Sequence, residues 1–112
     1  MLRGSGRYSG ADYRFEGIMD GNGGSGVAGE AELLAFADAA LYAGNSLAAA
    51  RRAVAARLGD QAMIDAAAVI AGFDAITRVA DGSGIPLEPP KAEATAEWRA
   101  RLGIDDYWRR KV

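Results

Sequence analysis

The sequence predicts an all-α protein, a small helical bundle of four main helices with a glycine-rich N-terminal arm. Apolar residues recur at three- and four-residue intervals in four segments, which is the period of an amphipathic helix. Hydrophobic residues make up 50 % of the chain but aromatic residues only 8 %. Alternating β-branched residues, which are typical of strands, are rare. A core rich in alanine suits closely approaching helices better than a sheet.

Residues 1–29 are expected to form a loosely ordered arm, and residues 30–112 a single helical domain. Most of the 15 glycines lie in the arm, and its acidic and basic side chains balance. The arm contains the spacing G-x-G-x-x-G at Gly21, Gly23 and Gly26. No buried strand is predicted before these glycines, so we do not expect a dinucleotide site. The same loop lacks the glycine and the glutamate that a calcium loop requires.

Three of the expected helices are short. The first covers residues 30–43 and begins with acidic side chains near its positive end. The second covers residues 47–58, with Ser46 as its expected N-cap and three arginines on a solvated face. The last covers residues 90–103 and begins with a proline, which suits the first turn of a helix.

A longer helix, from Asp60 to about Gly84, organises the rest of the chain. We expect Asp60 to be its N-cap and the helix to be buried on more than one side. Asp74 precedes Arg78 by four residues and Asp81 follows it by three, so one arginine can bridge two carboxylates. We interpret this as a surface ion-pair ladder, with a binding role as the alternative. The apolar stripe of the helix consists of Ala62, Ala66, Val69, Phe73, Ile76 and Ala80.

Composition excludes several kinds of chemistry. The chain has no cysteine and no histidine, so disulfides, thiolate metal sites and thiol redox reactions are excluded, and the commonest general base is missing. We expect no cofactor and no metal. The net charge of −2 argues against a nucleic-acid partner. No apolar leader begins at Met1, and the charges in the long helix argue against a membrane span, so we expect a cytoplasmic protein.

A recognisable pattern runs from Met63 to Leu87. Its motifs are Ile64-Asp65-Ala66, Phe73-Asp74, Arg78-Val79-Ala80-Asp81 and Gly84-Ile85-Pro86. This pattern resembles the C-terminal helix region of the carboxymuconolactone decarboxylase and alkylhydroperoxidase-D-like superfamily, and residues 32–37 resemble an earlier helix of that family. The resemblance implies an all-helical unit that packs as dimers, trimers or hexamers. Peroxidase members carry Cys-x-x-Cys-x-x-x-His, but the corresponding residues here, 43–51, contain neither cysteine nor histidine, so no catalytic residue is carried over.

These observations favour a non-peroxidatic structural domain that forms a homo-oligomer rather than an enzyme. The alternative is a thiol-independent enzyme or binder of a small organic acid that uses Tyr42, Asp74, Arg78 and Asp81. A carboxylate would then act as general base and the arginine would hold the carboxylate of the ligand. A third reading is a regulatory contact with another protein through the arm and the Tyr107-Trp108 tail, whose aromatic side chains we expect to pack on the bundle or on another subunit.

Overall fold

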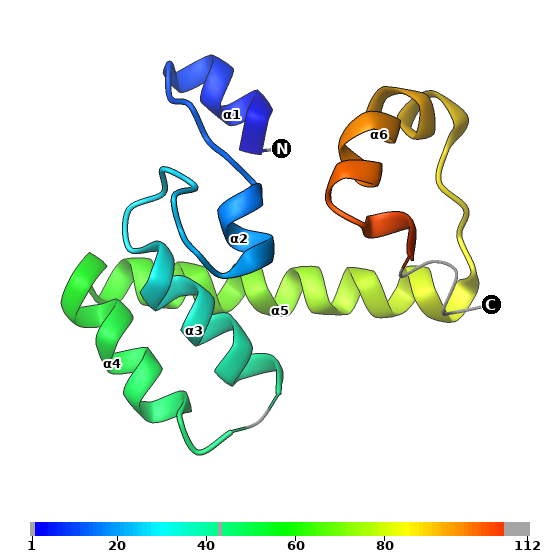
Figure 1. Ribbon diagram of the computed structural model, residues 1–112. Helices are drawn as coiled ribbons and strands as arrows, with labels where there is room; N and C mark the ends of the chain where they lie inside the picture. Colours follow the sequence, from blue (N-terminus) through cyan, green and yellow to red (C-terminus); the bar gives the residue numbers. More distant parts are fainter. Residues whose placement is uncertain (1, 43, 107–112) are drawn as a thin grey trace. The chain divides into compact units, whose positions relative to one another are not determined.

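The computed structural model describes residues 2–42 and 44–106 (Figure 1). The described residues form six helices and no strand, which confirms the all-α prediction. The chain divides into two compact units, residues 1–79 and residues 80–112, and the division falls inside the longest helix. The tail with Tyr107 and Trp108 lies outside the described residues.

The four main helices occupy the segments that the sequence predicts. They are α3 (Glu30–Leu41), α4 (Leu47–Leu58), α5 (Asp60–Ser83) and α6 (Pro89–Arg101). Each boundary lies within three residues of a glycine or proline, since these residues end or begin helices through their backbone geometry. The four segments are therefore helices, as their apolar periodicity predicts.

The arm contains two shorter helices, α1 (Leu2–Ser9) and α2 (Glu16–Asp20). Gly17 of α2 lies directly against the backbone carbonyl of Gly23, and the amide of Gly23 donates a hydrogen bond to the carbonyl of Gly17 at 3.1 Å. A side chain at Gly17 would occupy the same space as that carbonyl. The amide of Arg14 also donates to the carbonyl of Ser25 at 2.9 Å. Backbone contacts thus hold this glycine-rich segment in a defined path.

The core of the first unit lies between α3 and α4, which pack against each other. Phe36 and Ala39 of α3 and Val54 of α4 are its buried apolar residues among those described. Gly29 precedes α3 with a φ of 68°, and a Cβ at this position would lie 2.8 Å from Leu58 Cδ1. Glycine is therefore required both by the left-handed backbone and by the close approach of α4.

Two predicted helix caps differ from the structure. Ser46 does occupy the N-cap position of α4, but its side chain makes no capping hydrogen bond because its backbone is already helical, with φ −84° and ψ −12°. Asp60 is the first residue of α5 rather than its N-cap, since the preceding Gly59 leaves the helical region at φ 94° and ψ 162°. The Asp60 carboxylate still lies near the positive end of the helix dipole.

The prediction that α5 is buried on more than one side is wrong, because none of its residues is buried. Helix length gives the physical reason. With a rise of about 1.5 Å per residue, α5 is about 36 Å long and α3 and α4 are each about 18 Å long, so the two short helices cannot cover it. The half-buried residues of α5 are Ala62, Met63, Ala66, Ile70, Asp74 and Ala80.

The second unit is stabilised by one arginine of α6. The guanidinium of Arg99 donates to Asp105 Oδ1 at 2.6 Å, to Thr95 Oγ1 at 3.0 Å and to the carbonyl of Ala92 at 3.0 Å. Its side chain is only 22 % exposed. Arg99 therefore ties the residues that follow α6 back to the body of the helix.

Candidate association surface

Four polar residues were predicted as candidate binding residues, and the structure brings two of them together. Arg78 Nε donates a hydrogen bond to Asp74 Oδ2 at 3.0 Å, as their spacing on α5 predicts. This bond, together with the negative charge of Asp74, raises the pKa of Arg78 above its usual value. Tyr42 follows α3 and is 80 % exposed, whereas Asp81 belongs to the second unit. The structure therefore brings Asp74 and Arg78 into an ion pair, and a site that they share with Tyr42 and Asp81 stays a prediction.

A shallow apolar groove of about 330 Å³ lies beside that ion pair, within the first unit. It is lined by Leu41 at the end of α3 and by five residues of α5: Val69, Ile70, Phe73, Asp74 and Thr77. The hydroxyl of Thr77 is used locally, because it donates to the carbonyl of Phe73. Asp74 accepts from Arg78. The groove thus offers apolar surface, with its polar groups already engaged with neighbours on the same helix.

The apolar surface of the groove continues along α5. Val69, Phe73 and Ile76 are successive members of the predicted stripe, and they are 58 %, 56 % and 68 % exposed. Val79, one turn further on, is 65 % exposed. We call the exposed row formed by Val69, Phe73, Ile76 and Val79 the α5 stripe. Val69, Phe73 and Ile76 belong to the face that the sequence predicts to be buried, and Val79 extends this face. Periodicity shows which face of a helix is apolar and not what covers that face.

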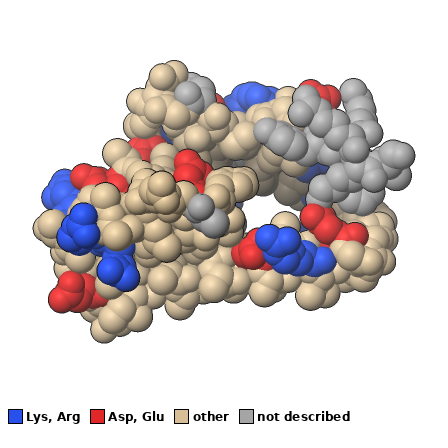
Figure 2. All heavy atoms as spheres, turned by 90° about the horizontal axis from the view of Figure 1, so that it is seen from below, with Lys and Arg blue, Asp and Glu red and all other residues tan. Residues whose placement is uncertain are grey.

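Charged side chains are sparse on the visible surface in Figure 2, where uncharged residues cover the larger area and acidic and basic groups form small separate clusters. Large contiguous apolar areas are uncommon on monomeric proteins, which seldom expose more than a few hundred Å² in one patch. At about 100 Å² for each residue, the α5 stripe is as large as the largest apolar patch of a typical monomer, and such patches often have a function.

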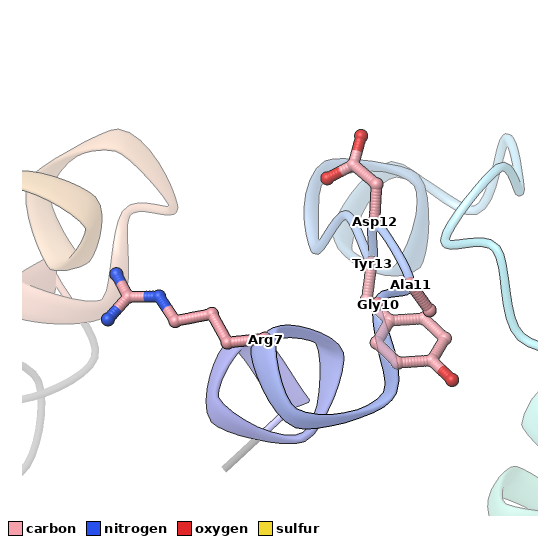
Figure 3. A pocket seen from close by; sticks show the side chains of 5 residues that line it. All are labelled: Arg7, Gly10, Ala11, Asp12 and Tyr13. Atoms are coloured by element: carbon pink, nitrogen blue, oxygen red, sulfur yellow. The ribbon is translucent and has the colours of Figure 1, made fainter.

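A second hollow, near the N-terminus, has a different character. It measures about 270 Å³ and is lined by Arg7, Gly10, Ala11, Asp12 and Tyr13 (Figure 3). The guanidinium of Arg7 extends away from Asp12 and Tyr13 in this view. The charged groups do not converge on a common point, so the hollow lacks the arrangement that a small-molecule site requires.

The glycine-rich loop is occupied by the chain itself. Glu30 Oε2 accepts hydrogen bonds from the amides of Gly24 and Ser25, each at 3.0 Å, and Ser25 is fully buried. These are amides of the segment that contains G-x-G-x-x-G. A phosphate bound there would need such amides free. In this structure the amides of Gly24 and Ser25 are therefore already paired with Glu30.

Within residues 2–42 and 44–106, no group of three acidic side chains is placed to hold a metal ion. Among the helices described, none combines the length and the apolarity needed to cross a bilayer. Comparisons of the chain with protein-family models, with curated proteins and with solved structures find no match.

Proposed function

We propose that this protein is a helical assembly domain, which acts by associating with copies of itself and not by catalysis. The observation that carries the proposal is the α5 stripe, whose four large apolar residues are each more than half exposed. Burying such residues in a contact between subunits is favourable, at about 25 cal/mol per Å² of apolar surface. In a single chain these side chains stay in contact with water, so this free energy is not gained.

The chemistry of the chain supports the same proposal. It contains no cysteine or histidine, so the thiol chemistry of the superfamily that residues 63–87 resemble is excluded. In the alternative proposal, a small organic acid binds near Arg78. This alternative has less support, because the guanidinium is already paired with Asp74 and the adjoining groove is largely apolar. An acid would have to compete with an attached carboxylate for the same cation.

The test is the solution mass by light scattering on a sizing column, over a range of protein concentrations. We expect a mass of two or more chains of 11.7 kDa. A parallel assay of peroxide consumption with a dithiol reductant should show no turnover. A monomer at all concentrations would refute the assembly proposal, and turnover that requires this chain would refute a non-catalytic role.

A further inference from the structure

The exposed apolar surface of α5 and of Leu41, at the end of α3, is about as large as one side of a small protein interface. The α5 stripe and Leu41, which lines the adjoining groove and is 43 % exposed, give five large apolar residues. Each offers about 100 Å², so a pair of copies would bury about 1,000 Å² in total, the lower limit for a specific interface. Full burial of these side chains in both copies therefore reaches the size at which a specific contact begins, in the range of weak, reversible dimers.

The spacing along α5 then restricts how the two helices can pair. The residues Ala62, Ala66, Val69, Phe73, Ile76 and Ala80 are separated by four, three, four, three and four positions. This is the a/d pattern of a heptad repeat, which places one continuous seam along a helix. The seam is uneven, because alanines occupy its two ends, at positions 62, 66 and 80, and its larger residues Val69, Phe73 and Ile76 lie between them.

An antiparallel arrangement makes the side-chain volume of the central layers of the contact more even. If the two helices cross midway between Val69 and Phe73, Ala66 of each copy meets Ile76 of the other, and Val69 meets Phe73. Both of these pairs set a smaller residue against a larger one, while Ala62 meets Ala80 at each end of the seam. In a parallel pair, Phe73 would meet Phe73 and Ala66 would meet Ala66, which crowds one layer and leaves a void in another.

The space around the helix at the crossing point fits this arrangement. Gly72 lies beside Phe73, and a Cβ at Gly72 would meet nothing within 4 Å. Glycine inside a helix costs about 1 kcal/mol relative to alanine, and no contact within the described chain requires it at this position. At the centre of an antiparallel pair, Gly72 of each copy flanks the seam and allows the two backbones to approach. Antiparallel helices also align their dipoles favourably.

From these points we infer that the partner of the α5 stripe is the α5 stripe of a second copy, paired antiparallel with Ala66 of one chain opposite Ile76 of the other. This inference rests on the proposed self-association and specifies its geometry. It requires no cofactor and no other protein. It also makes the two copies equivalent, because an antiparallel pair of identical helices has twofold symmetry.

Disulfide trapping tests the geometry, since the natural chain has no cysteine. Two single variants, Ala66→Cys and Ile76→Cys, are prepared with and without a purification tag, so that mixed and unmixed pairs differ in mass. A disulfide requires Cα atoms within roughly 7 Å. Residues ten positions apart on a helix are displaced by about 15 Å along the axis, so parallel pairing in register cannot join the two variants. Circular dichroism verifies that each variant is helical.

We expect mild oxidation of the mixture to give a mixed covalent dimer, and each variant alone to give little. Trapping of each variant with itself, and none in the mixture, would overturn the antiparallel inference in favour of parallel pairing. A dimeric mass without any trapping would overturn the inference but leave self-association standing through another surface. A monomeric mass for the unmodified chain would overturn both, and would mean that the α5 stripe serves a different occupant.

Discussion

Replacing Ile76 by serine should weaken self-association while leaving the separate chain folded. Ile76 is 68 % exposed, so its removal opens no cavity in the fold, and isoleucine and serine have similar helix propensities. Full burial of an isoleucine is worth about 1.5–3 kcal/mol. Because Ile76 is 68 % exposed, association can bury about two-thirds of its side chain, and the two copies together lose about 2–4 kcal/mol of association free energy. This loss raises the dissociation constant about 30- to 700-fold.

Ile64→Ser is the matched control, because it is the same substitution at a 55 % exposed position of the same helix. Ile64 is two residues from both Ala62 and Ala66, so it points about 200° away from them and away from the seam. Sedimentation equilibrium over a series of protein concentrations gives the dissociation constant of each variant. Thermal melting at protein concentrations below the dissociation constant compares the thermal midpoints of the monomers. Equal dissociation constants for Ile76→Ser, Ile64→Ser and the unmodified chain would show that the seam is not the association surface.

Three further predictions concern contacts within each unit. Arg99→Ala should destabilise the second unit by about 2–4 kcal/mol, because it removes three hydrogen bonds including one to a carboxylate. Loss of the exposed Lys91 ion pair should cost less than about 1 kcal/mol. Amide hydrogen exchange across α6 distinguishes the two variants, and equal protection in both would argue against the role given to Arg99. Glu30→Ala should increase proteolysis in the glycine-rich loop, since two amides lose their acceptor at a cost of about 2–3 kcal/mol. Glu32→Ala should leave the cleavage rate within about threefold of that of the unmodified chain. Similar cleavage rates for the two variants would contradict this prediction. Gly17→Ala should lower the thermal midpoint by several degrees, because its methyl group meets the carbonyl of Gly23, and an unchanged midpoint would mean that the backbone moves aside at little cost.

Features that depend on local geometry could be predicted from the sequence. The four main helices follow from apolar spacing and from glycine and proline at their ends. The Asp74–Arg78 ion pair follows from the helix itself, because residues four apart lie on the same face. The cap of α5 was misplaced by one residue, since the backbone at Gly59 and not the side chain of Asp60 determines where the helix begins.

Features that depend on what surrounds an element could not be predicted. The α5 stripe was assigned to the core because an apolar face has the same pattern whether the chain or a partner covers it. The contact of Glu30 with the amides of Gly24 and Ser25 depends on how the loop turns back toward α3, and no local pattern reports that.

The division of the chain inside α5 also determines how its halves can be studied. The two compact units meet between Val79 and Ala80, yet α5 continues through Ser83 without interruption. In a chain cut at that border, the carbonyls of residues 76–79 would lose the amides of residues 80–83 that donate to them, and the helix would fray into the region of Ile76. The natural place to shorten the protein is Gly84, where φ is 66° and the helix has ended. A fragment of residues 1–84 keeps α5 whole, and its mass in solution would report whether α6 is needed for self-association.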